Sequence, residues 1–274
     1  MCHACVTGAV QARMLSRRDL FRATPALAVT AAATAAVTAA APRALAAGHE
    51  RVVDMTHTVS PAFPTYFGAP GIAAEQKFNF AEHGFNLIEL TVNEHTGTHI
   101  DAPLHFSADG ASVDSIPVGQ LVCPLCVIHI HEKAAEDREA QVTPDDLEAW
   151  IARNGPIPDN AVVAMHSGWE AHIGTDKYRG VEDGVQHFPG FHLEAAQMLI
   201  ETTGAVCLAA DTLSLDVGSS STFDTHYAWL PTGRFGIENM ANLAEVPEAG
   251  ATLIVGAPKH EGGTGGPARL IALV

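Results

Sequence analysis

The 274-residue sequence has little positive charge. It carries 15 Lys and Arg against 31 Asp and Glu, a formal net charge of −16 at pH 7. Nucleic acids and anionic membrane surfaces are bound through clustered basic side chains, so this composition argues against both as partners. The HExxH helix of metalloproteases and the GxSxG turn of serine hydrolases are also absent from the sequence, and we expect neither chemistry.

Cysteine is scarce as well. Two of the five Cys lie near the N-terminus, and the other three are Cys123, Cys126 and Cys207. An odd number argues against a disulfide framework. Cys123 and Cys126 stand in an apolar run that predicts a buried strand, where positions three apart face opposite sides. We therefore expect cysteines that pack in the core, and a redox pair or metal knuckle is the less favoured alternative.

The N-terminal segment differs from the rest of the chain. Arg17 and Arg18 are followed by an Ala-rich stretch over 23–41 and a small-residue cleavage pattern. This layout resembles a twin-arginine export signal, which predicts removal of residues 1–46, export, and no stable membrane insertion afterwards. The alternatives are an uncleaved anchor or a disordered tail. Residues 1–46 hold five Arg and one Asp, so the remainder carries −16 − 4 = −20. We expect residues 47–274 to form a single domain.

Within that remainder, strand patterns outnumber helix patterns and the two are interspersed. This order predicts an α/β domain with a mixed sheet. The clearest helix follows Thr143, which predicts a cap, with Pro144 in the first turn and a stop at Gly155. The predicted strands are 51–58, 86–93, 121–130, 161–165, 205–210, 251–255 and 269–274, the predicted helices 143–153 and 191–203, with a loop over 60–71 and a short helical turn over 238–243.

One short stretch concentrates residues of metal-ligand type. His95, His99, Asp101 and His105 all stand at odd positions, with a Gly and a Pro between them where the chain can bend. In an extended chain these side chains lean to one side. The pattern favours a divalent metal held by the first three over a loop of hydrogen-bonded polar residues. His105 approaches Asp101 only if the chain bends, and would then bind a second ion or act as a base.

The full stretch, HTGTHIDAPLH, resembles the HxGTHxDxPxH signature of the cyclase family, which includes bacterial kynurenine formamidases and isatin hydrolases. Similar segments occur at 54–57, 166–169, 188–191 and 211–216, so the resemblance runs from about residue 51 to the C-terminus. It implies the mixed sheet of the kynurenine formamidase-like (swivelling β/β/α) type. It also implies a homodimer or larger homo-oligomer, in which the early loop can line a neighbour's pocket.

The resemblance further implies a ligand set. In members with two ions, Asp101 bridges and His105 joins the second ion with a His and a Glu twelve residues later, a spacing met by His226 and Glu238. In members with one ion, His105 acts as the base. Considered alone, His226 is typical of a partly buried polar residue, and Glu238 of a charge at a helix start. The metal ligands implied are His95, His99, Asp101, His105, His226 and Glu238.

The function expected from these residues is that of a metal-dependent hydrolase of non-peptide C–N bonds. A divalent ion lowers the pKa of its bound water and supplies hydroxide for attack on an amide carbonyl. Imidazole and carboxylate ligands without thiolate suit Zn or Mn, as one or two ions. The resemblance implies a small aryl formamide or a cyclic amide as substrate. The alternatives are a non-catalytic exported metal or small-molecule binding protein, and a ring-closing cyclase or lyase.

Five side chains are candidates for the wall of the substrate pocket. Aromatic residues of the early loop are the first group, and residues that follow a predicted strand end are the second. Core packing accounts for Trp169 equally well. Asp211, Thr212 and Asp216 are candidates either for hydrogen bonding to the ligands or for turn formation, and turn formation is favoured. The predicted pocket residues are Phe63, Tyr66, Phe67, His166 and Trp169.

Overall fold

The computed structural model describes residues 50–274; the expected export signal lies outside the described residues. The chain divides into two compact units. Of the described residues, 74–91 belong to one unit, and 50–73 with 92–274 belong to the other. Every residue of the predicted site falls in the larger unit, which is described first.

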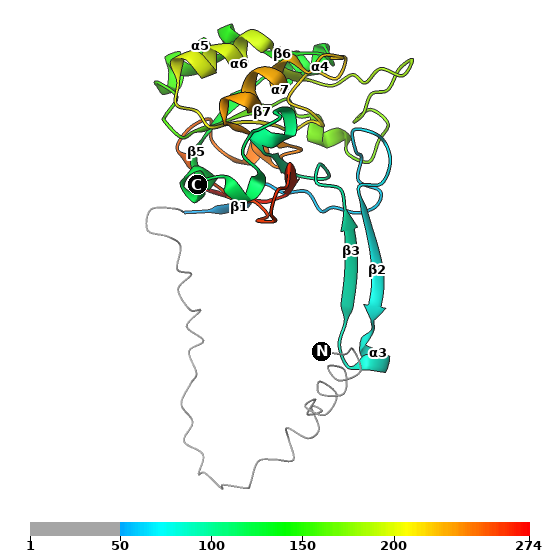
Figure 1. The fold of residues 1–274 in the computed structure, drawn as a ribbon. Coiled ribbons are helices and arrows are strands. Elements are labelled where there is room, and N and C mark those ends of the chain that lie inside the picture. The colour runs from blue at the N-terminus through cyan, green and yellow to red at the C-terminus, as the bar shows by residue number, and fades with distance from the viewer. Residues whose placement is uncertain (1–49) are drawn as a thin grey trace, which may run out of the picture. The chain divides into compact units, whose positions relative to one another are not determined.

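A nine-stranded sheet forms the centre of the larger unit (Figure 1). Strands β5, β7, β9 and β10 pair in parallel, and the strands on either side of them pair antiparallel, so the sheet is mixed as expected. In spatial order the strands are β1 (Val52–Asp54), β13 (Arg269–Leu273), β11 (Ala251–Gly256), β5 (Val122–His129), β7 (Val162–His166), β9 (Cys207–Ala210), β10 (Phe235–Glu238), β4 (His99–Asp101) and β12 (Gly265–Pro267).

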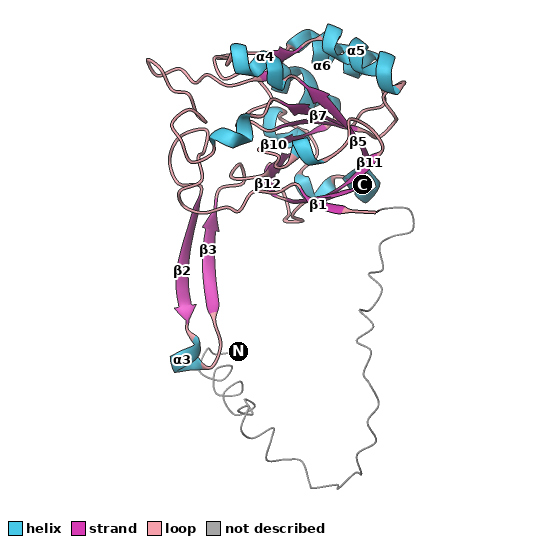
Figure 2. Cartoon of the chain, turned by 180° about the vertical axis from the view of Figure 1, so that it is seen from behind, coloured by secondary structure: helices cyan, strands magenta, loops and turns pink. Residues whose placement is uncertain are grey.

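Helices gather on one side of this sheet, as Figures 1 and 2 both show. They are α4 (His131–Glu136), α5 (Pro144–Asn154), α6 (Leu193–Thr202) and α7 (Asp224–Trp229), and two short strands, β6 (Gln141–Val142) and β8 (Gly190–Phe191), pair near them. Helix α5 begins as predicted, because Thr143 and Asp146 form a capping box. It ends at Gly155, whose φ of 87° favours glycine.

The two faces of the sheet bury different clusters. Leu125 and Val127 of β5 join a core cluster with residues of β11 and β13, whereas Cys126 and Ile128 join a second cluster with residues of α5 and α6. Cys123 lies in the first cluster. The two cysteines of the apolar run therefore pack on opposite faces, and burial raises the pKa of each thiol to about 12. The expectation of packing cysteines is confirmed.

The expected helical turn over 238–243 is wrong, since only its last residue is helical. Glu238 is the last residue of β10 and pairs in register with His99 of β4. The turn follows later, as a 3₁₀ segment over Leu243–Glu245. The sequence alone predicts Glu238 as a charge at a helix start. Its polar side chain interrupts the apolar pattern by which β10 would be recognised as a strand. Across residues 50–274, no helix has the length and apolar character needed to span a membrane.

The smaller unit is a pair of strands joined by one helical turn. Strands β2 (Ile72–Phe78) and β3 (Leu87–Val92) form a two-stranded sheet, and β3 confirms the strand expected over 86–93. The turn between them, α3 (Phe80–His83), is capped by Asn79, whose side-chain oxygen accepts from the backbone N–H of Glu82. It ends at Gly84, where φ is 77°.

Candidate metal centre

Strands β4 and β10 bring the first side chains together. Their antiparallel register sets His99 opposite Glu238 and Asp101 opposite Gly236. A side chain at residue 236 would crowd its neighbours, because a Cβ there would lie 2.9 Å from Leu215 Cδ1 and 3.2 Å from Asp101 Oδ2. The glycine thus leaves room for the Asp101 carboxylate beside the neighbouring strand.

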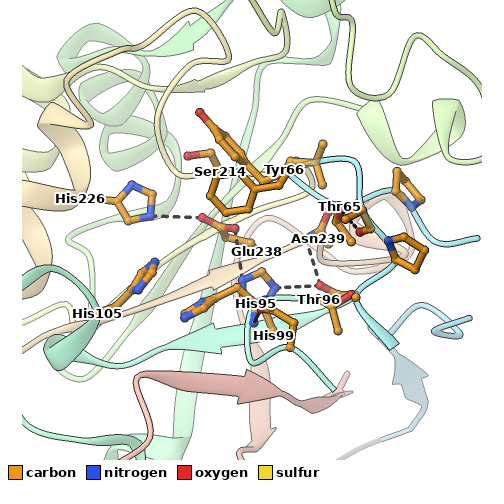
Figure 3. A pocket seen from close by; sticks show the side chains of 18 of the residues that line it. Thr65, Tyr66, His95, Thr96, His99, His105, Ser214, His226, Glu238 and Asn239 are labelled. Carbon is orange, nitrogen blue, oxygen red and sulfur yellow. Dashed lines mark hydrogen bonds and ion pairs between the residues drawn. The ribbon is translucent and has the colours of Figure 1, made fainter. Parts of the chain in front are cut away.

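The side chains of His99, His226 and Glu238 point toward one another at the pocket (Figure 3). His99 Nε2 lies 3.4 Å from Asp101 Oδ1 and 3.3 Å from Glu238 Oε2. His226 Nε2 lies 3.2 Å from Glu238 Oε1 and 3.7 Å from Asp101 Oδ2. Ligands held at about 2.0–2.2 Å around a tetrahedral ion are about 3.3–3.6 Å apart. His99, Asp101 and Glu238 therefore lie close enough together to hold one ion, and His226 approaches the other oxygen of each carboxylate.

Two buried atoms in the centre lack hydrogen-bond partners. They are His99 Nε2 and Asp101 Oδ2, and an unpaired buried polar atom is costly. His99 Nδ1 lies 2.8 Å from the carbonyl oxygen of Gly97, so Nδ1–H donates to that oxygen. The lone pair of Nε2 is then free for a metal, which is the arrangement typical of histidine ligands. The donor set and its orphaned atoms fit a divalent ion.

The charges of the centre hold protons on its imidazoles when no cation is present. Burial opposes a proton on His99, but Asp101 and Glu238 outweigh it and raise the His99 pKa to about 10. The pKa of His226 is raised as well: burial opposes its proton, and Asp101, Asp216 and Glu238 favour it. Metal binding therefore has to displace protons from these ligands.

Helix α7 supplies His226, and Asp216 orients it. Asp216 Oδ1 accepts from the backbone N–H of Thr225 and Oδ2 from that of His226, so its carboxylate binds the first turn of the helix. The His226 side chain also donates from Nδ1 to Asp216 Oδ2 over 2.5 Å, which turns Nε2 toward Glu238. Of the two roles considered for Asp216, the structure thus shows the hydrogen-bonding one, in which it fixes a candidate ligand.

His105 reaches the centre through the bend at Pro103. It lies in a 3₁₀ turn over Pro103–Phe106, and its ring stacks on that of His95 with centroids 3.8 Å apart. Burial lowers the His105 pKa to about 4 against the opposing charge of Asp101, so its imidazole is neutral at pH 7. His95 Nδ1 lies 2.6 Å from Asp101 Oδ1.

Two groups of possible ligands share Asp101. One comprises His99, Asp101 and Glu238, and the other comprises His95, Asp101 and His105. This arrangement accommodates both roles expected for His105, as a base beside one ion or as a ligand of a second ion bridged by Asp101. All six residues of the predicted ligand set thus lie together, including the two more than 120 positions away from His99.

A pocket of about 390 Å³ opens beside the centre, a volume that suits a small organic molecule. Tyr66 and Phe67 line it as predicted. Phe106 and Phe223 line it too, and sequence reasoning missed both; the position of Phe106 next to His105 is the signal that would have found it. The ligand-type residues of its wall are His95, His99, His105, His226 and Glu238.

Three predicted pocket residues do not line this pocket, and that part of the prediction needs correction. Phe63 is buried, its ring 5.8 Å from that of His57. Trp169 donates from Nε1 to the carbonyl of Tyr178 and packs in a buried aromatic cluster, so core packing explains it. His166 pairs with another histidine outside the pocket.

Comparison with known proteins places the chain in a family. A family model described as "Putative cyclase" matches residues 53–217, which is more than half of the chain, and the chain belongs to this cyclase family. It is 29% identical over 249 residues to the isatin hydrolase of Roseibium aggregatum, covering 84% of this chain and 94% of the relative. It is 25% identical over 222 residues to the kynurenine formamidase of Salinibacter ruber, covering 80% and 96%.

A solved structure gives the same result for the fold. The isatin hydrolase A of Labrenzia aggregata, bound to benzyl benzoate, superposes with a TM-score of 0.77 at 33% identity, covering 82% of this chain and 93% of the other. The expected family and the α/β fold are confirmed. Both named relatives hydrolyse C–N bonds other than peptide bonds, which confirms the prediction of a metal-dependent hydrolase of that class.

Proposed function

We propose that this chain opens the ring of a small cyclic amide fused to an aromatic ring, of the isatin class, and releases a carboxylate. The observation that carries the proposal is the pocket wall, in which aromatic side chains adjoin the buried donor set. Tyr66, Phe106 and Phe223 offer apolar faces for an aryl ring. The similarity to isatin hydrolases supports the same substrate class.

The residues that would hold the metal are His95, His99, Asp101, His226 and Glu238. His105 would act as the general base. A bound divalent ion, Zn or Mn, would polarise the amide carbonyl and make a coordinated water more acidic. His105 is neutral at pH 7 and lies on the pocket wall. It can therefore accept a proton from the attacking water and donate it to the departing amide nitrogen.

Hydrogen bonds from neighbouring residues hold two of the ligand rings, those of His226 and His95, in place. Asp216 holds the His226 ring, and Thr264 Oγ1 lies 3.0 Å from His95 Nε2. Thr264 is itself held by Glu94, which accepts both its backbone N–H and its hydroxyl hydrogen. A ligand ring held on both sides loses little freedom on binding metal.

The test combines metal removal with a substrate panel. Purified protein is assayed on isatin, a hydantoin, a formanilide and a lactone, before and after treatment with EDTA, and products are identified by mass. We expect uptake of one water on isatin, loss of activity with EDTA, and recovery with Zn or Mn. Activity unchanged by EDTA in a metal-free sample would show the proposal to be wrong.

The same assay separates the alternatives. An aryl formamidase, favoured by the similarity to kynurenine formamidase, would act on the formanilide at least as well as on isatin. A non-catalytic binding protein would bind metal without turnover, and a cyclase would close rings when given the carboxylate.

We also propose export and a homo-oligomer. The paired arginines and the Ala-rich stretch of the sequence support export. Fractionation of cells producing the chain with and without the Arg17→Lys and Arg18→Lys changes tests it. Light scattering on the purified chain tests the oligomer.

A further inference from the structure

Three histidines gather at a second place in the sheet. His129 is the last residue of β5 and His166 the last of β7, and the two are register partners in these parallel strands. His131 opens helix α4 two residues after His129. The chain thus places three imidazoles at the carboxyl end of two neighbouring parallel strands, an edge where ligand sites commonly form. We call these three residues the imidazole triad.

The three rings are in mutual contact. The ring centroids are 4.9 Å apart for His129 and His166, 5.1 Å for His131 and His166, and 5.6 Å for His129 and His131. Nitrogens bound to one ion at about 2.0–2.1 Å lie about 3.3 Å apart, and the triad nitrogens, one from each residue, are within 4.8 Å of one another.

The present hydrogen bonding of the triad is compatible with metal binding. His129 Nδ1 and His166 Nδ1 are 2.7 Å apart, so one of them carries hydrogen and the other offers its lone pair. Burial lowers the pKa of His166 to about 4 and also lowers that of His129. Both imidazoles are therefore neutral at pH 7, the form that binds metal. His166 is buried, whereas His131 is exposed, which gives an ion access from solvent.

The triad is separate from the metal centre already described. None of its residues lines that pocket. Along β7, Ala164 faces the same core cluster as Ile237 of β10. Strand alternation puts His166 on the side of Ala164 and Glu238 on the side opposite Ile237. The side chains of His166 and Glu238 thus point to opposite faces of the sheet.

We propose that His129, His131 and His166 form a second metal site that binds a divalent transition ion such as Zn²⁺, Ni²⁺ or Cu²⁺. Neutral imidazoles suit these ions, whereas Mg²⁺ and Ca²⁺ require oxygen ligands. Three protein ligands leave a fourth position of a tetrahedral ion open to water or to another ligand. The site would tie the end of β5, the start of α4 and the end of β7 to one ion.

The test counts Zn²⁺ ions bound per chain. The purified full chain is dialysed against micromolar free Zn²⁺, and bound zinc is measured by mass spectrometry for the wild type, His131→Gln and a matched control, His192→Gln. His192 is a partly exposed histidine that precedes α6 and belongs to neither cluster. We expect His131→Gln to bind one equivalent less than the wild type and the control, with kcat/KM changed by less than about twofold, since the variant leaves the pocket intact.

A second variant distinguishes zinc bound at the triad from zinc bound at the metal centre. In an Asp101→Ala chain we expect one equivalent of Zn²⁺ to remain and to disappear when His131→Gln is added. Co²⁺ loaded into the Asp101→Ala chain should give the visible absorption of a tetrahedral site. Equal zinc content in the wild type and His131→Gln would overturn the proposal and leave a hydrogen-bonded histidine cluster. Because zinc content is read independently of turnover, an inactive enzyme would not affect this outcome.

Discussion

Two clusters of histidines lie in this sheet, and they differ in their carboxylates. At the metal centre, Asp101 and Glu238 lie within 3.4 Å of His99 Nε2, and without a cation the His99 pKa is raised to about 10. At the imidazole triad, none of the three members is a carboxylate, and burial lowers the His166 pKa to about 4. Metal binding therefore competes with protons at His99, and hardly at all at His166 at pH 7.

The difference bears on what each cluster can do. Carboxylates add negative charge that holds a divalent ion firmly and can bridge two ions, and they adjoin an aromatic pocket. The triad has no carboxylate ligand and one exposed member, His131. The first arrangement suits catalysis, and the second suits an ion that exchanges with solvent.

Removal of Asp101 should separate the two clusters most sharply. Asp101 belongs to both ligand groups of the metal centre. We expect Asp101→Ala to lower kcat/KM on isatin by about 10⁴-fold or more, the scale seen when one member of a unit that acts together is lost. Zinc at the triad should remain. Activity assays and zinc analysis measure both, with Asp109→Ala at an exposed position as the control. A variant that kept its activity would remove Asp101 from the mechanism.

His105 decides how the metal centre works. If it is the base, His105→Gln lowers kcat by about 10²–10⁴-fold, and the number of bound ions is unchanged. We expect this result, because the His105 imidazole is neutral and lines the pocket. Single-turnover kinetics and zinc analysis of the same sample measure it. Loss of one equivalent of metal would instead assign His105 to a second ion.

Sequence reasoning predicted the residues that meet at the first cluster and did not recognise the second. The parity of His99 and Asp101 is a local property of an extended chain, and the structure preserves it in β4, whereas His95 precedes this strand. His226 and Glu238 came only from the family's spacing, because the pairing of β10 with β4 is non-local. The triad depends on the same kind of pairing: His129 and His166 are 37 residues apart, and only the register of β5 and β7 makes them neighbours.

The prediction of the pocket residues was limited in the same way, because the sequence does not show which side chains meet in space. Tyr66 and Phe67 were predicted from an aromatic loop, but the same reasoning also predicted Phe63, which faces inward to His57. Composition says that a loop carries aromatics and does not say which of them faces a site. Strand boundaries were predicted well where apolar runs were continuous, as in β5 and β7. Strands β10 and β12 were not predicted, because they are short and glycine interrupts their apolar pattern.

Acid should weaken the fold through the triad. The pKa of His166 is about 4 in the folded state, and its ordinary value is 6.5. The contribution of the neutral imidazole to the free energy of unfolding is therefore fully present above pH 6.5 and is lost as the pH falls toward 4. The contribution is at most about 3 kcal/mol. Urea unfolding of EDTA-treated protein at several pH values measures it. We expect the free energy of unfolding of His166→Gln to fall less steeply between pH 6.5 and 4 than that of the wild type. Parallel curves would contradict the assignment.

The smallest expected effect comes from Asp216, which orients a ligand without reaching the ion. It binds His226 Nδ1 and the first backbone N–H groups of α7. Asp216→Asn can still accept a hydrogen bond, but it loses the charge that favours the correct ring orientation. We expect about 10–100-fold weaker metal binding at the first cluster, with the triad unaffected, measured by competition with a chromophoric chelator. Asp224→Asn, at the exposed start of the same helix, is the matched control. An Asp216→Asn affinity equal to that of Asp224→Asn would mean that the helix alone holds His226 in place, and that the charge of Asp216 serves the fold rather than the ion.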